Sequence, residues 1–174
     1  LTRVTDPAGV AVRHILDSYW ALPVLDAWER DAPRRYLDFG SGGGWPFVPL
    51  AAHFACEAWA CEKTGKKVRV LRSILEEVLP RAKVFDRQVR ELRKPVFDLV
   101  TSRAVGRLED TFENSAHCVA KKGGVWMAYK GPSVEEELAA WRAQLAPLKF
   151  KELPLVEAEL PDGSRRCFVG AYRR

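Results

Sequence analysis

A chain of 174 residues, of which 47% are hydrophobic and 29% charged, has the composition of an ordinary globular protein and the length of one domain with a substantial core. It contains no run of about 18 apolar residues, so a membrane-spanning helix is not expected, and its first residues lack the pattern of a signal peptide. The formal net charge of +5 favours an anionic partner.

Apolar patterning predicts helices and strands that alternate along the chain. Asp6 and Pro7 are residue types that favour the N-cap and the first position of a helix, which we expect over 8–25. Further helices are predicted at 47–54, 66–79, 108–119 and 134–145. Short apolar segments typical of strands lie at 36–39, 57–62, 82–86, 96–102 and, after a turn, within 121–131. The last segments, 152–160 and 165–173, are predicted to form a hairpin around the intervening "DGS".

This alternation indicates a doubly wound α/β (Rossmann-like) sheet with an antiparallel C-terminal hairpin and an N-terminal helix. We expect a single domain, with a helical lead-in at 1–33 and an α/β core at 34–174. Ligands of such sheets bind at the carboxyl ends of the strands, where the topology switches. The segment "DFGSGGGW" follows the first predicted strand, so its glycines fall at that place.

Two familiar nucleotide-binding motifs fit these glycines poorly. A phosphate-binding P-loop needs GxxxxGK[ST], but Gly65-Lys66 has neither the upstream glycine nor a following Ser or Thr. A dinucleotide fingerprint needs GxGxxG, and Trp45 occupies the position of its third glycine.

A third pattern, acid-x-GxGxG, fits Asp38, Gly40, Gly42 and Gly44, and Glu62 follows Gly40 by 22 residues, at the end of the second strand. That spacing suits a carboxylate that accepts hydrogen bonds from ribose hydroxyls. A short loop without a lysine suits a nucleoside with an amino-acid tail, S-adenosylmethionine, better than a triphosphate. The alternative is that the glycines only allow a strand and a helix to pack closely.

Several segments, in this order and spacing, resemble the bacterial small-subunit ribosomal RNA guanine-N7 methyltransferases, the glucose-inhibited division protein B family. They are "RHILDS", "LDFGSGGGWPFVPLA", "EKTGKKVRVL", "FDLVTSRAV", "GGVWMAYKGP" and "DGSRRCFV". The resemblance implies a class I methyltransferase fold, S-adenosylmethionine as methyl donor, and N7 of a guanosine in 16S ribosomal RNA, free or in the small subunit, as acceptor. Alternatives are a different RNA or small-molecule acceptor, or a non-catalytic RNA-binding remnant.

The resemblance also implies which residues hold the donor. The methionine part would lie against the glycine loop and Trp45, where the family usually has Phe. Arg90 stands where the family has an acid, and Phe47 where it has a glycine. No general base is expected, and Arg103 matches a family arginine with a positioning role near the donor. The complete set of expected donor contacts is Asp38, Gly40, Gly42, Trp45, Glu62, Lys63, Thr64, Val89, Arg90 and Arg103.

Basic residues on and beside the predicted helix at 66–79 form either a solvated face or an RNA contact. The residues predicted to contact RNA are Lys66, Lys67, Arg69, Lys130, Arg165 and Arg166. His14 and Asp17, three residues apart on one helix face, are either a structural pair or a proton relay.

The four cysteines, Cys56, Cys61, Cys118 and Cys167, lie in or beside apolar runs, and no two have CxxC spacing. We therefore expect reduced thiols and no metal site. The sequence thus predicts a cytoplasmic, monomeric enzyme.

Overall fold

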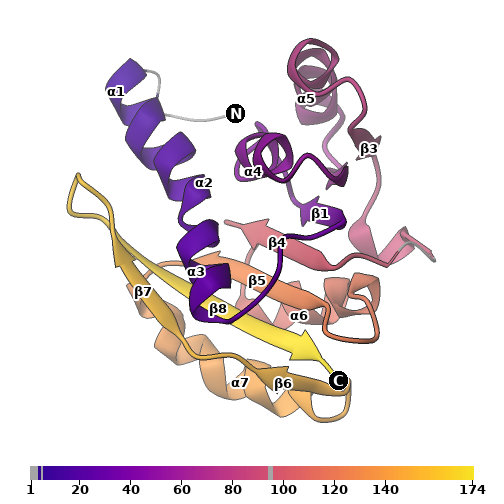
Figure 1. Ribbon diagram of the computed structural model, residues 1–174, viewed down its shortest axis with the longest axis vertical. Helices are drawn as coiled ribbons and strands as arrows, with labels where there is room; N and C mark the ends of the chain where they lie inside the picture. The colour runs from indigo at the N-terminus through magenta and orange to yellow at the C-terminus, as the bar shows by residue number, and fades with distance from the viewer. Residues whose placement is uncertain (1–3, 5, 94–95) are drawn as a thin grey trace.

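The computed structural model describes residues 4, 6–93 and 96–174 (Figure 1). Within them, eight strands form one sheet with the order β3-β2-β1-β4-β5-β8-β6, and β7 also pairs with β8. Strands β1 to β5 are parallel to their neighbours among themselves, whereas β8 is antiparallel to β5, β6 and β7. The strands are β1 (Arg35–Phe39), β2 (Glu57–Cys61), β3 (Lys83–Phe85), β4 (Leu99–Arg103), β5 (Val125–Lys130), β6 (Phe150–Glu152), β7 (Val156–Glu159) and β8 (Arg165–Arg173). The predicted doubly wound sheet with an antiparallel end is confirmed.

Helices cover both faces of this sheet (Figure 1). The α-helices are α1 (Pro7–Val10), α2 (Asp17–Tyr19), α3 (Ala21–Ala27), α4 (Phe47–Phe54), α5 (Gly65–Val78), α6 (Leu108–Ser115) and α7 (Glu135–Leu145). A π-helical segment, η1 (Ala11–Leu16), joins α1 to α2, and short 3₁₀ turns are η2 (Val89–Glu91), η3 (Ala116–Cys118) and η4 (Pro132–Val134). The helix expected over 8–25 is therefore a succession of segments, and it starts as predicted: Asp6 accepts a hydrogen bond from the Gly9 N–H at 2.6 Å, with Pro7 at the first position.

The prediction of a single strand over 152–160 is wrong. The structure has two strands there, β6 and β7, and each pairs with a different part of β8. Pro154 lies between them and cannot donate a ladder hydrogen bond, while its carbonyl accepts one from the Trp28 indole N–H at 2.8 Å. The interruption therefore attaches the sheet to the end of the N-terminal helices.

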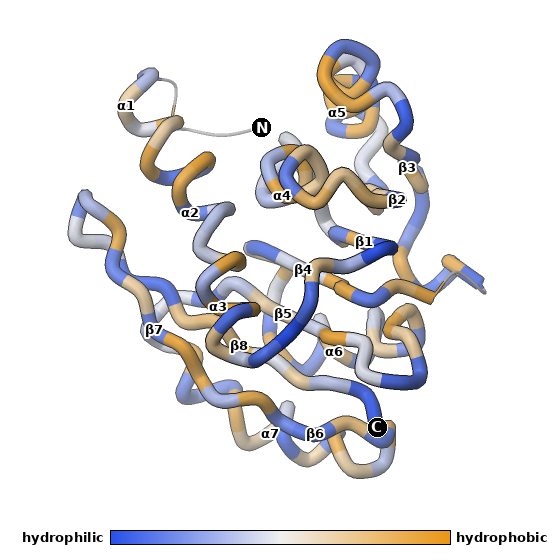
Figure 2. Tube along the Cα trace, viewed as in Figure 1, coloured by the Kyte–Doolittle hydropathy of each residue, from blue (hydrophilic) through white to orange (hydrophobic). Residues whose placement is uncertain are grey.

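The hydrophobic core lies in two layers, one on each face of the sheet. Alternate residues of a strand point to opposite faces, so Leu37 packs with Phe112 and Trp126, while Tyr36 packs with Phe47 on the other face. Helices α6 and α7 cover the first face and α3, α4 and α5 the second. Apolar and polar residues alternate around α5 in Figure 2, as expected for a helix with one buried side. In the described part of the chain, no helix is long and apolar enough to cross a membrane.

Candidate functional site

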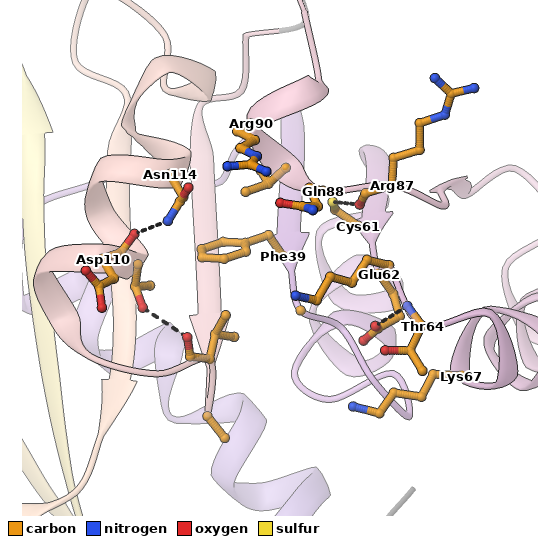
Figure 3. A pocket seen from close by; sticks show the side chains of 16 residues that line it. Phe39, Cys61, Glu62, Thr64, Lys67, Arg87, Gln88, Arg90, Asp110 and Asn114 are labelled. Atoms are coloured by element: carbon orange, nitrogen blue, oxygen red, sulfur yellow. Dashed lines mark hydrogen bonds between the residues drawn. The ribbon is translucent and has the colours of Figure 1, made fainter.

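A cavity of about 310 Å³ opens at the carboxyl ends of β1 and β2 (Figure 3). In the parallel register Phe39 lies opposite Cys61, so the loops after both strands start side by side. Strand β1 lies between β2 and β4, so the strands that follow β1 are added first on one side of it and then on the other. The carboxyl ends of these strands are therefore at the topological switch point of the sheet. The cavity is lined by Phe39, Gly40, Cys61, Glu62, Lys63, Thr64, Lys67, Arg87, Gln88, Val89, Arg90, Ala104, Val105, Asp110, Thr111 and Asn114.

The glycine loop requires a residue without a side chain at Gly40. The Gly40 N–H donates to the Cys61 carbonyl at 2.7 Å, which holds the loop against the end of β2. The Gly40 φ of 73° is unfavourable for other residues, and a Cβ there would lie 2.5 Å from Cγ2 of Val105. Any side chain at this position would therefore push apart the loops that follow β1 and β4.

Glu62 is 5% exposed, and its carboxylate faces the cavity from the end of β2 (Figure 3). Its Oε2 accepts from the Gly42 N–H at 3.1 Å and its Oε1 from the Thr64 N–H at 2.8 Å. These bonds fix the carboxylate in the lining, and each oxygen retains a lone pair that can accept from a ligand hydroxyl. Glu62 therefore has the geometry expected of a ribose ligand.

Asp38 is fully buried directly before the glycine loop. Its Oδ1 accepts from the Thr101 hydroxyl at 2.7 Å, and that hydroxyl is 2.8 Å from the Tyr36 hydroxyl. Among the described residues no hydrogen-bond partner exists for Oδ2. Burial raises the pKa of Asp38 to about 7, against the opposing effects of the Thr101 bond and the Arg103 charge. An unpaired buried carboxylate oxygen at this place is suited to a cationic group such as an ammonium.

Residues of α6 and η2 complete the cavity, and sequence reasoning missed most of them. Asp110 and Asn114 lie on one side of Phe39, and Glu62 and Lys67 on the other (Figure 3). The helix after the fourth strand begins at this edge of the sheet, so a polar residue in its first turn is the signal that could have found Asp110. Asn114 lies one turn further along the same face, four residues after Asp110.

The structure separates the predicted donor residues into two groups. Gly40, Glu62, Lys63, Thr64, Val89 and Arg90 line the cavity, and Gly42 adjoins it through its bond to Glu62. The others, Asp38, Trp45 and Arg103, do not belong to this lining. Arg103 and Trp45 take part instead in a second arrangement at the same edge of the sheet.

This second arrangement, the Asp17 cluster, consists of Asp17, His14, Arg103 and Arg166. Asp17 is fully buried, and its two carboxylate oxygens accept from Arg103 at 2.7 Å and from Arg166 at 2.8 Å. The Arg103 guanidinium also lies 3.0 Å from Nδ1 of His14. The His14 ring stacks on Trp45 of the glycine loop, with centroids 5.3 Å apart. His14 and Asp17 thus both contact Arg103, which fits a structural pair better than a proton relay.

The basic residues predicted to contact RNA differ in their surroundings. Lys66 and Arg69 are exposed on α5, and Lys67 reaches the cavity. Lys130 pairs with Glu137 at 2.7 Å and donates to the Gly106 carbonyl, and Arg166 pairs with Asp17. Arg165 is 67% exposed and 4.0 Å from Glu159. Within the described ranges no group of three or more His, Cys, Asp or Glu side chains could hold a metal ion.

Comparison with known proteins places these features in a family. The sequence profile GidB, described as rRNA small subunit methyltransferase G, matches residues 1–166. The ribosomal RNA small subunit methyltransferase G of Serratia proteamaculans is 37% identical over 177 residues, which span 97% of this chain and 79% of that protein. Its counterpart from Leptothrix cholodnii is 32% identical over 163 residues, which span 91% and 74%.

Solved structures with the same fold have much lower identity. Magnesium protoporphyrin IX methyltransferase from Synechocystis, with bound S-adenosylhomocysteine, superposes with a TM-score of 0.72 at 15% identity, over all of this chain and 90% of that one. A SAM-dependent methyltransferase from Thiobacillus denitrificans, in complex with the same product, gives 0.61 at 12% identity, over 88% and 90%. These likenesses support the class I methyltransferase fold.

Proposed function

The chain belongs to the GidB family of ribosomal RNA small subunit methyltransferases, and we propose that it transfers a methyl group from S-adenosylmethionine to N7 of a guanosine in 16S ribosomal RNA. The observation that carries this proposal is the family match together with a cavity at the switch point whose wall holds Glu62. The size of the cavity is at the lower end of small-molecule sites.

The residues present fit the donor. Glu62 would offer carboxylate oxygens to the ribose hydroxyls, and Val89 and Arg90, which line the same cavity, would contact the adenine ring. The unpartnered Oδ2 of Asp38 is suited to the donor's ammonium, and Arg103 to its carboxylate. The methionine part of the donor would lie against Trp45. Because Arg90 replaces an acid, its contribution is restricted to its backbone and its aliphatic stem.

The chemistry does not need a general base. S-adenosylmethionine supplies an electrophilic methyl group on a sulfonium, and guanine N7 carries an in-plane lone pair and no proton. The chain's task is to hold the two reactants in line, which lowers the entropic part of the barrier. Arg103 has a positioning role in this scheme, and it does not transfer a proton.

The RNA would be held by basic residues whose side chains are exposed or half-buried. We assign this role to Lys66, Lys67 and Arg69 of α5 and to Arg165 of β8. Lys130 and Arg166 satisfy internal carboxylates, so we do not include them. We further propose that the protein acts as a cytoplasmic monomer.

The test is incubation of the protein with labelled S-adenosylmethionine and small-subunit RNA, either free or assembled, followed by mapping of the modified base. Label at N7 of one guanosine is the expected result. Donor binding without methylation of that RNA would indicate another acceptor. A folded protein that binds RNA but not the donor would be a non-catalytic remnant.

A further inference from the structure

The Asp17 carboxylate pairs with two guanidiniums at the carboxyl edge of the sheet. Asp17 is 0% exposed, while the side chains of its partners Arg103 and Arg166 are 15% and 26% exposed. The three residues come from different elements, α2, β4 and β8. Removing these charges from water is costly, and apolar residues of similar size often stabilise such a position equally well. An ionic group here therefore suggests a requirement for orientation as well as for stability.

The orientation of Arg103 is set by the N-terminal helices. One of its terminal nitrogens donates to Oδ2 of Asp17 at 2.7 Å and to the Arg13 carbonyl at 3.3 Å, and the other lies 3.0 Å from Nδ1 of His14. All three acceptors lie within residues 13–17, whereas Arg103 is the last residue of β4. The planar guanidinium is consequently held in one plane by a segment far away in the sequence.

His14 extends this arrangement to the glycine loop. Burial, and then the positive charge of Arg103, lower the pKa of His14, so the neutral ring that can accept from Arg103 is favoured near neutral pH. The same ring stacks on Trp45 at an interplanar angle of 14°. The contacts of Asp17 therefore lead through Arg103 and His14 to the loop that follows β1.

We propose that Asp17 is a positioning residue of the methyl-transfer reaction, whose carboxylate holds the Arg103 guanidinium in the orientation that receives the donor. This inference rests on the proposed function, in which Arg103 meets the donor's carboxylate. In this proposal Asp17 does more than attach the N-terminal helices to the C-terminal hairpin, because it also orients Arg103.

A matched control exists at the same helix–hairpin contact. Arg13 pairs with Asp162 at 2.7 Å, and both side chains are more exposed, at 56% and 21%. The side chains of this pair attach the same helical segment to the loop between β7 and β8, and Arg103 contacts only the backbone carbonyl of Arg13. Asp162→Asn therefore removes an attachment and leaves the Arg103 orientation intact.

The experiment measures S-adenosylmethionine and S-adenosylhomocysteine affinity by calorimetry, and single-turnover methyl transfer to small-subunit RNA, for the full chain and its variants. Asp17→Asn is expected to weaken binding of both ligands at least tenfold and to slow transfer further, whereas Asp162→Asn changes both less than twofold. Equal losses in the two variants would reduce Asp17 to an attachment point. An inactive wild type that binds the donor would instead overturn the proposed acceptor, and the affinities would still test Asp17.

A double-mutant cycle shows whether Asp17 acts through Arg103. In an Arg103→Gln background, Asp17→Asn should lower donor affinity by less than a further twofold, and a full additional tenfold loss would contradict the proposal. Should Asp17→Asn not fold, Arg103→Lys serves instead, because lysine keeps the charge but cannot hold Asp17 and His14 in one plane. It should reproduce the loss of donor affinity with its thermal stability retained, and normal affinity would overturn the proposal.

Discussion

Two fully buried aspartates at the same edge of the sheet have opposite surroundings. Asp17 accepts from two guanidiniums, whereas Asp38 accepts from one hydroxyl and leaves an oxygen without a partner in the described part of the chain. In the Asp17 cluster the protein itself neutralises the buried charge. Directly before the glycine loop, one oxygen of Asp38 keeps no partner among the described residues. This contrast matches the roles proposed above, in which the Asp17 cluster supports the site and Asp38 contacts the donor.

The strongest test of this contrast compares the pH dependence of unfolding in wild type and Asp38→Asn. Asp38 has a folded pKa of about 7 against an ordinary value of 3.8, so unfolding releases its proton between these limits and stability falls as the pH rises through them. The wild type should lose up to about 4 kcal/mol from this group by pH 8, and the variant should not. Chemical denaturation at pH 4, 6 and 8 measures both slopes, and parallel slopes would show that the pKa of Asp38 is not raised in the folded protein.

Removing the carboxylate of Asp17 should instead destabilise the folded protein. Asp17→Ala leaves two partly buried guanidiniums without their carboxylate, which should cost about 3 kcal/mol in the free energy of unfolding at pH 7. Asp162→Ala, which breaks the more exposed pair, should destabilise the fold much less than Asp17→Ala, because water screens that pair. Urea unfolding of the two variants checks the difference, and equal values would remove the special position of Asp17.

Glu62 should matter for the ligand more than for the fold. Glu62→Ala should weaken S-adenosylmethionine binding by roughly 1.5–3 kcal/mol, or about ten- to a hundredfold, because charge-assisted bonds to the ribose are lost. Calorimetry of wild type and variant gives this number. Glu57, an exposed acid on the same strand that pairs with Lys83, provides a matched control as Glu57→Ala, whose affinity should stay within twofold of wild type.

The smallest expected effects concern the basic face of α5. Lys66→Glu combined with Arg69→Glu should weaken RNA binding and flatten its logarithmic salt dependence by about one unit or less for each lost phosphate contact, with donor affinity unchanged. Filter binding between low and moderate salt measures the slope. An unaltered slope would leave these residues as a solvated helix face.

The same contrast explains what the sequence could predict. The bonds of Glu62 join residues 20 and 2 positions apart, within a single strand–helix–strand unit whose geometry is nearly fixed. The position of Glu62 beside the glycine loop was therefore predictable from spacing. The bonds of Asp17 span 86 and 149 positions. They depend on how the N-terminal helices pack against β8, and no local pattern encodes that packing. The break at Pro154 was missed for a related reason. Both flanking segments have strand-like residues, and they are distinguished only by pairing with different parts of β8.

Strand β8 has a consequence for how the chain folds. Its residues 165–173 pair with β5, β6 and β7, and Arg166 within it neutralises Asp17. The ring of Trp28, the residue that follows helix α3, also lies against Gly170. The N-terminal helices therefore complete their contacts only after a segment more than a hundred residues later has joined the sheet. Such long-range closure makes folding slow relative to proteins with local contacts. During synthesis, the parallel strands β1 to β5 would be the first part able to associate, and the helices at the start of the chain among the last to be fixed.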